Sequence, residues 1–212
     1  MRYIALAIVA AALTLPAPAV RAIPMAFGGL LSGANETPPN NSPGAGTVTV
    51  VLDPTAQTIE ILASFFGLTT NDTAAHIHCC QTTAGTPPTV MVATTMPTFG
   101  AFGPNPEFPL GGTSGVYDQT FNLSDSRFYN PAFVMAEGGT IAGAENALIG
   151  AIEQGLTYFN IHTSQNPGGE LRTQLVPLGV SVPAPIAGAG LPGLILACGA
   201  LLTLARRRRQ IA

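Results

Sequence analysis

The chain has 212 residues, of which 47% are hydrophobic and 9% charged, and it contains 24 glycines and 19 prolines. This composition argues against long helices in the domain and favours many short strands joined by turns. The chain has no lysine, and its middle part holds Arg127 and Arg172 against all eleven acidic residues. Such an acidic domain excludes nucleic acid as a partner, because binding phosphates needs basic patches.

The N-terminal residues 1–22 are predicted to form a signal peptide. Arg2 precedes the apolar run 4–15, which is too short to span a bilayer, and small residues suited to cleavage follow it. The alternative is a buried first helix. We expect the protein to be exported.

Alternating apolar residues predict several strands between Phe27 and Val176. The clearest pair is a hairpin with strands at 47–52 and 57–66, joined by a turn that opens at Asp53-Pro54. The irregular but apolar segment 94–112 is expected to cover one end of the sheet. Further strands are expected at 27–33, 74–80, 89–93, 114–123, 157–161 and 170–176.

One helix is expected inside the domain. Apolar residues from Ile141 to Ile152 recur at helical spacing, and Gly155 suits the helix end. Residues 124–139 are ambiguous, since Ser124-Asp125 can cap a short helical turn that Asn130-Pro131 would stop. The element order predicts a mainly β fold: a single antiparallel β-sandwich or barrel-like domain with one edge helix.

The C-terminal part predicts a membrane anchor. After a linker at 177–185, residues 186–205 carry no charge and, as a helix, would reach about 30 Å, the thickness of a bilayer core. The positive-inside rule places the following arginines in the cytoplasm and the domain outside. We therefore expect a transmembrane helix that anchors the exported domain before it reaches the cell surface or the extracellular space. The arginines are Arg206, Arg207, Arg208 and Arg209.

Three motifs in order resemble those of the CHRD (chordin-type) domain. They are LSGANETPP at 31–39, AHIH at 75–78, and YFNIHT at 158–163 followed by PGGELR at 167–172. The resemblance covers roughly residues 27–176. It implies a β-rich extracellular module and brings no established reaction.

The tail at 186–212, with the proline motif before it, is similar to a bacterial PEP-CTERM-type sorting signal. The proline motif is Val182, Pro183 and Pro185, with Ala184 where the commonest form has glutamate, and the apolar helix and the arginine cluster follow. This similarity implies a sorting protease of the exosortase type as a partner.

All three histidines lie in the domain motifs. His76 and His78 are two apart on an expected strand, so their rings share one face, and His162 lies on what would be a neighbouring strand. Three converging imidazoles would bind copper or zinc. The alternative is structural: neutral imidazoles bonded to backbone groups, Asn160 or Glu170.

Other candidate residues are given structural roles. Cys79 and Cys80 are adjacent in an exported chain, which favours a vicinal disulfide or an inert pair over soft metal ligands. Arg172 is expected to pair with a nearby carboxylate, such as Glu170 on the same strand face, and Glu36 to make a structural bond in a loop.

No catalytic residue is predicted, since no nucleophile-base order or phosphate loop stands out. The sequence favours a non-enzymatic module of the cell surface or extracellular matrix that binds a protein or an exopolysaccharide. The alternative is a metal-binding or redox domain centred on the histidines.

Overall fold

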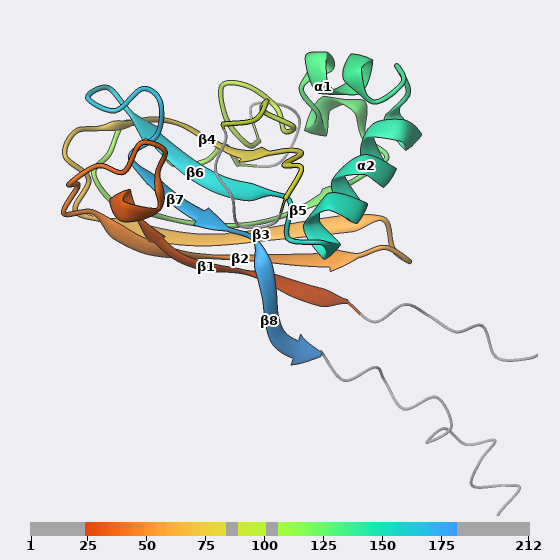
Figure 1. Ribbon diagram of the computed structural model, residues 1–212, viewed down its shortest axis with the longest axis horizontal. Coiled ribbons are helices and arrows are strands. Elements are labelled where there is room, and N and C mark those ends of the chain that lie inside the picture. The colour runs from red at the N-terminus through yellow and green to blue at the C-terminus, as the bar shows by residue number, and fades with distance from the viewer. Residues whose placement is uncertain (1–23, 84–88, 101–105, 182–212) are drawn as a thin grey trace, which may run out of the picture.

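The computed structural model describes residues 24–83, 89–100 and 106–181. Within these ranges eight strands form one antiparallel sheet that curls into a half-barrel, with two short helices at one end (Figure 1). The strand order is β4-β6-β7-β1-β2-β3-β5, and β8 pairs with β1. The strands are β1 (Met25–Ser32), β2 (Ala45–Asp53), β3 (Thr58–Phe66), β4 (Asp72–His78), β5 (Gly115–Asn122), β6 (Tyr158–Thr163), β7 (Leu171–Gln174) and β8 (Val176–Ser181).

The predicted hairpin is confirmed as β2 and β3. The two strands pair in one unbroken register from Ala45↔Phe66 to Asp53↔Thr58. Their alternate residues point into the curl of the sheet, where burial of apolar side chains stabilises the fold. The buried set in this hairpin is Val48, Val50, Leu52, Ile59, Ile61, Ala63 and Phe65.

Residues 94–100 and 106–112 contact the two edge strands on the open side of the half-barrel. Its Thr98 bridges to Ala75 of β4, and Tyr117 of β5 donates a hydrogen bond to the Pro106 carbonyl (3.1 Å). The rings of Phe99 and Phe108 are 1% exposed and pack against Phe159 and Phe65. The described parts of this apolar segment therefore pack on the core, and the expectation that it covers one end of the sheet stays a prediction.

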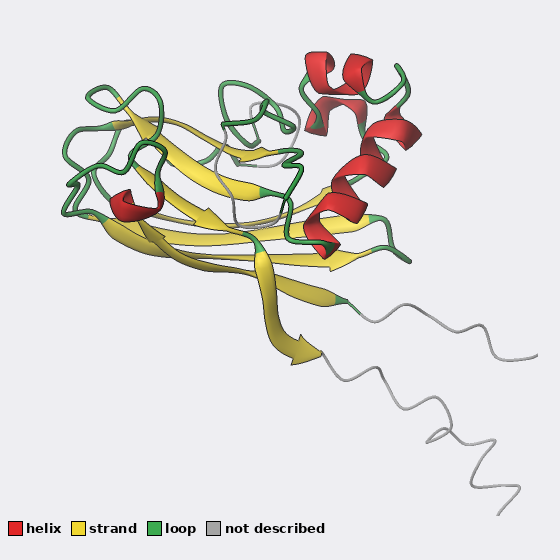
Figure 2. Cartoon of the chain, in the orientation of Figure 1, coloured by secondary structure: helices red, strands yellow, loops and turns green. Residues whose placement is uncertain are grey.

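Two α-helices are present in the described part of the chain, where one was predicted (Figure 2). The predicted helix is α2 (Ile141–Glu153), capped by the Thr140 hydroxyl, which accepts from the Gly143 backbone N–H. The additional helix is α1 (Pro131–Ala136). Asn130 caps its start by accepting from the Ala132 N–H (3.1 Å), so Asn130-Pro131 begins a helix rather than ending one.

The capping role expected of Asp125 is present. Its carboxylate accepts from the Arg127 backbone N–H at the start of the 3₁₀ helix η2 (Ser126–Phe128). A second 3₁₀ helix, η1 (Gly33–Asn35), follows β1.

The strand predicted at 89–93 is not formed over that range. This segment forms one isolated bridge to β4, between Val92 and His78, and the Val90 carbonyl accepts from the His78 imidazole instead of joining a ladder. Among the described residues no helix has the length and apolar character needed to cross a membrane. The predicted signal peptide at 1–22, the helix at 186–205 and the sorting motif lie outside the described residues.

Candidate functional site

The strands β4, β6 and β7 carry a polar face on the side opposite the core. Cross-strand pairs put His76, Asn160 and Arg172 in one row, and His78 and Tyr158 in the next. The alternate residues of the same strands, among them the fully buried apolar set Ala75, Ile77, Phe159, Ile161 and Leu171, belong to the core cluster. One sheet region therefore has an apolar inner face and a polar outer face.

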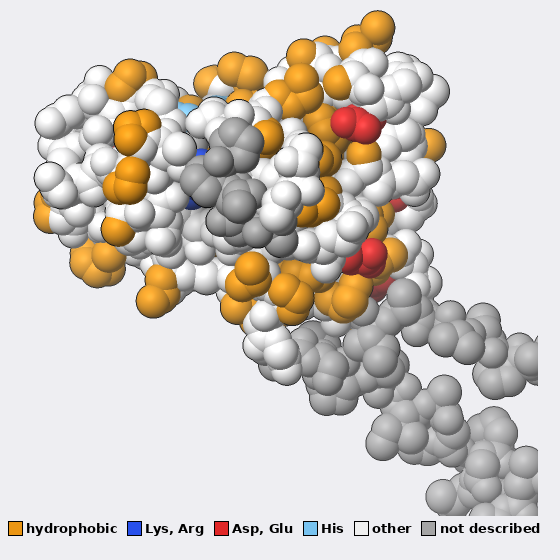
Figure 3. Space-filling model, viewed as in Figure 1, with side chains coloured by type: hydrophobic (Ala, Val, Ile, Leu, Met, Phe, Trp, Pro, Cys, Tyr) orange, Lys and Arg blue, Asp and Glu red, His pale blue; other side chains and the backbone are white. Residues whose placement is uncertain are grey.

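This outer face is nevertheless buried. His76, His78 and Arg172 are each 4% exposed, and Tyr158 and Asn160 are each 1% exposed. Loops cover these side chains, since His78 bonds the Val90 carbonyl and His162 bonds the Pro167 carbonyl. In the view of Figure 3, small areas of histidine and of basic side chain lie close together among uncharged side chains. Buried polar groups at this density indicate a built site rather than a solvated face.

The three histidines lie close together. His162 lies on β6, next to β4, and its Nε2 atom is 3.2 Å from Nδ1 of His76. The ring centroids are 5.8 Å apart for His76 and His78, and 6.0 Å apart for His78 and His162. One potential ligand nitrogen from each ring lies within 4.8 Å of the other two.

Two backbone carbonyls orient two of the imidazoles. Nδ1 of His78 donates to the Val90 carbonyl (2.7 Å), and Nδ1 of His162 donates to the Pro167 carbonyl (3.0 Å). In a neutral ring this leaves Nε2 as an acceptor: Nε2 of His162 accepts from Nδ1 of His76 (3.2 Å), whereas Nε2 of His78 has no partner. Metal-binding histidines are commonly fixed in this way by a bond from the other ring nitrogen. The Nε2 atoms of His76 and His78 are buried and have no hydrogen-bond partner.

The environment keeps the imidazoles neutral. Burial lowers the pKa of His76 to about 3, and the neighbouring His162 and His78 add to this effect, against a hydrogen bond that the imidazole donates to the Pro97 carbonyl. Burial also lowers the pKa of His78 to about 4, and the charges of His162 and Arg172 add to this effect. Burial is also the main cause that lowers the pKa of His162. Neutral imidazole is the form that binds metals.

Arg172 does not form the predicted ion pair. Its guanidinium carbon lies 3.4 Å from the centre of the Tyr158 ring, in a cation–π contact. The same ring stacks on His78 at a centroid distance of 4.5 Å and an interplanar angle of 11°. Tyr158, which sequence reasoning treated only as part of a motif, thus links Arg172 to the histidines.

Glu170, the expected partner, is bonded elsewhere. Its carboxylate accepts hydrogen bonds from Ser42 (2.6 Å), Thr69 (2.7 Å) and Thr163 (2.6 Å), which come from three different segments. Although burial opposes the charged form, these hydrogen bonds outweigh it and lower the pKa of Glu170 to about 2. Glu170 therefore holds the loops around the site together.

Glu36 lies at the edge of the same polar cluster and is only 6% exposed. Burial raises its pKa to about 7, although the charge of Arg172 acts in the opposite direction. Its Oε1 atom has no hydrogen-bond partner. The loop position expected for Glu36 is correct, but no pattern around this residue indicates its burial.

Gly169 explains why the loop before Glu170 is rich in glycine. Its φ is +129°, which L side chains rarely adopt, and a Cβ there would collide with the Glu36 carboxyl and the Asn160 amide. The loop can therefore close over the polar face only with glycine at this position.

Cys79 and Cys80 are joined as a vicinal disulfide directly after β4. The Cys79 side chain is 1% exposed and belongs to the apolar core cluster. The group of converging metal ligands consists of the three histidines and includes neither cysteine.

The fold and site define a β half-barrel with a buried imidazole cluster under its loops. Residues 27–175 match the CHRD domain, so the chain belongs to the CHRD-domain family, as the motifs predicted. No curated protein and no solved structure matches the chain.

Proposed function

We propose that the domain binds a copper or zinc ion through His76, His78 and His162. The observation that carries this proposal is the convergence of three neutral imidazoles, two of which have buried Nε2 atoms without a partner. A buried polar atom without a hydrogen bond costs free energy, and a bound ion would remove that cost for both rings.

The donor set suits either metal. Imidazole is a good ligand for both copper and zinc, whereas calcium and magnesium need oxygen ligands. Ligand nitrogens around a tetrahedral zinc stand about 3.4 Å apart, given a metal–nitrogen distance of roughly 2.0–2.1 Å. One potential ligand nitrogen from each of the three rings lies within 4.8 Å of the other two. Three protein ligands would leave one coordination position for water or another small molecule.

Titration of the purified full-length protein with Cu²⁺ and Zn²⁺ tests this proposal, together with metal analysis of protein purified without a chelator. We expect one ion per chain. The absence of any binding tighter than micromolar would end the proposal and leave the histidines with a structural role.

We also propose that the domain works outside the cytoplasm, first anchored by residues 186–205 and then released or attached at the cell surface. The signal-like segment at 1–22, the motif at 182–185 and the arginine cluster support this proposal. Fractionation of cells with and without an exosortase-type protease tests it. The protein should stay in the membrane fraction when the protease is missing.

The wider role favoured by the sequence, a non-enzymatic surface module that binds a protein or an exopolysaccharide, stays a prediction. A pull-down of the full-length protein with native exopolysaccharide tests it.

A further inference from the structure

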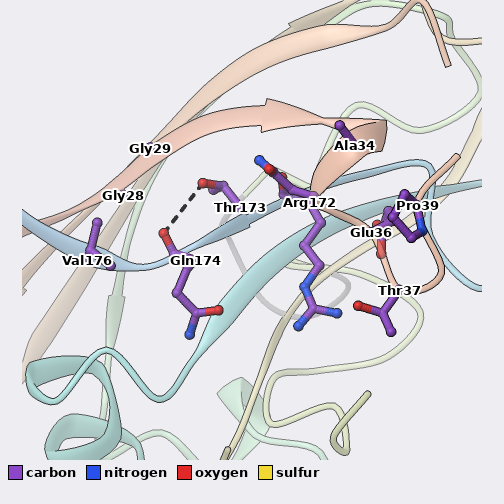
Figure 4. A pocket seen from close by; sticks show the side chains of 11 residues that line it. Gly28, Gly29, Ala34, Glu36, Thr37, Pro39, Arg172, Thr173, Gln174 and Val176 are labelled. Carbon is purple, nitrogen blue, oxygen red and sulfur yellow. Dashed lines mark hydrogen bonds between the residues drawn. The ribbon is translucent and has the colours of Figure 1, made fainter. Parts of the chain in front are cut away.

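A pocket of about 480 Å³ lies where strands β1 and β7 part (Figure 4). At one end of this gap Ser32 of β1 pairs with Arg172 of β7, and at the other end Gly28 of β1 pairs with Val176 of β8. Both pairs belong to the same antiparallel register. The residues between these pairs form no ladder. The parted strands are bridged by the Asn35 amide, which donates to the carbonyls of Leu30 (3.1 Å) and Arg172 (3.0 Å). The opening is therefore a built feature of the sheet.

The wall of this pocket carries a buried cation with free donors. The Arg172 side chain is 4% exposed and extends between the side chains of Gln174 and Thr37 (Figure 4). Within the described residues, its guanidinium forms no ion pair and donates no hydrogen bond, and its contact is the Tyr158 ring. A guanidinium carries five N–H donors and stays charged at all physiological pH values. A buried charge of this kind normally has an acceptor beside it.

A second polar group in the pocket limits the charge of any ligand that accepts hydrogen bonds from Arg172. Glu36 also lines the pocket, with its Oε1 atom buried and without a partner. A carboxyl group at this position repels a doubly charged anion more than a singly charged one. A protonated Glu36 can also donate a hydrogen bond to a bound carboxylate, which an oxyanion accepts readily.

We propose that this pocket binds a small carboxylate-bearing ligand, which accepts two parallel hydrogen bonds from the Arg172 guanidinium. Planar guanidinium and planar carboxylate match in this geometry, and the stacking on Tyr158 holds the guanidinium in place before the ligand arrives. Thr37, Asn35 and Gln174 supply polar lining for the remainder of the ligand. The inference does not depend on a metal in the histidine cluster, so it is tested with metal-free protein.

The test uses nuclear magnetic resonance of the full-length wild-type protein, observing the arginine Nε–H signals. The probes are D-glucuronate and D-glucose, which differ in the carboxylate group, together with acetate and inorganic phosphate. We expect saturable shifts of the Arg172 signal with glucuronate and acetate and no shift with glucose. Arg127 is the internal control, because it is exposed and already paired with Asp125 (2.7 Å).

Substitution adds a second measurement. Arg172→Lys keeps the charge but loses the two-pronged donor, so affinity for glucuronate should fall roughly tenfold or more. Arg127→Lys is the matched control and should leave the affinity unchanged. The proposal is overturned if no carboxylate shifts the Arg172 signal saturably, if glucose shifts it equally, or if phosphate binds more tightly than both carboxylates. The wild-type spectra decide the question even if Arg172→Lys fails to fold.

Discussion

The Nδ1 atom of His76 lies 3.2 Å from the Nε2 atom of His162, although 86 positions separate the two residues in the chain. The contact exists because β4 and β6 are hydrogen-bonded neighbours and both residues lie on the face that points away from the core. Loops then bury this face, which removes the water that would otherwise satisfy the rings. The proposed metal site depends on this combination of proximity, neutrality and burial.

If the histidines bind the metal, removing one ligand should weaken binding strongly. We expect His78→Gln and His162→Gln each to lower Cu²⁺ affinity by a factor of about 100 or more, since loss of an outer-shell partner alone costs about 10–100-fold. Isothermal titration measures the affinity, and electron paramagnetic resonance reports nitrogen coordination. The double variant Cys79→Ser/Cys80→Ser is the control and should bind normally. Loss of binding in that control alone would point to the cysteines instead.

The histidines should make the domain sensitive to acid. Their pKa values are about 3 for His76 and about 4 for His78 in the folded chain, against 6.5 for ordinary histidine. The unfolded chain therefore binds more protons below pH 6.5, and the free energy of unfolding should fall as the pH drops from about 6.5 towards 4. Urea unfolding at a series of pH values measures this. His78→Gln should flatten the dependence.

Glu36 should change the pH dependence of the free energy of unfolding in the direction opposite to the histidines. Its folded pKa of about 7 lies above the ordinary value of 4.5, so the folded chain binds more protons between these limits. Its ionised carboxylate lowers the free energy of unfolding above pH 7, and this unfavourable contribution fades as the pH falls towards 4.5. Glu36→Gln should therefore stabilise the domain at pH 8 and steepen the loss of stability on acidification. An unchanged pH profile in this variant would mean that Glu36 titrates normally.

Glu170 should be the most costly acidic residue to neutralise. Glu170→Gln replaces a carboxylate that accepts from three hydroxyl groups by an amide with only one acceptor oxygen. We expect a loss of about 3 kcal/mol at pH 7, since hydrogen bonds to charged groups are worth about 1.5–3 kcal/mol each. The wild-type advantage should vanish as the pH falls from about 4.5 through the folded pKa of about 2. The exposed Glu153→Gln is the control and should leave the midpoint of chemical unfolding almost unchanged.

The two glycines before Glu170 should differ in their tolerance of alanine. In Gly169→Ala the alanine must adopt a positive φ, and its Cβ collides with Glu36 and Asn160. The free energy of unfolding should therefore fall by about 1–3 kcal/mol or more. Gly168→Ala has open space and should change stability little. Chemical unfolding of the two variants side by side measures the difference. Equal effects would show that the loop moves freely to admit a side chain.

The sequence predicted what depends on local periodicity. The β2–β3 hairpin follows from apolar residues that recur every two positions, and the helix α2 from apolar residues that recur about every 3.6 positions. The shared face of His76 and His78 follows from the same two-residue period of a strand. The helix α1 is not predicted, because Asn130-Pro131 is also typical of a helix end, whereas here Asn130 caps a new helix that begins at Pro131.

The parts that could not be predicted depend on contacts between distant segments. Glu170 was expected to bond Arg172 because the two share a strand face, but three hydroxyl groups from other segments reach it first. The stacking of Arg172 on Tyr158 joins two strands, and the burial of Glu36 needs the loop at Gly169. No local pattern encodes which loop covers a sheet face.

The metal and carboxylate proposals together predict that the two ligands assist each other. The Arg172 charge lies close enough to lower the pKa of His78, so it also opposes a cation among the imidazoles. A carboxylate on Arg172 would neutralise that charge, and Cu²⁺ affinity should rise several-fold, on the order of 1 kcal/mol. By reciprocity, Cu²⁺ should tighten glucuronate binding by the same factor. Titrating each ligand with and without the other measures both directions, with glucose in place of glucuronate as the control. Two independent affinities would show that the sites do not sense each other's charge, even if both ligands bind.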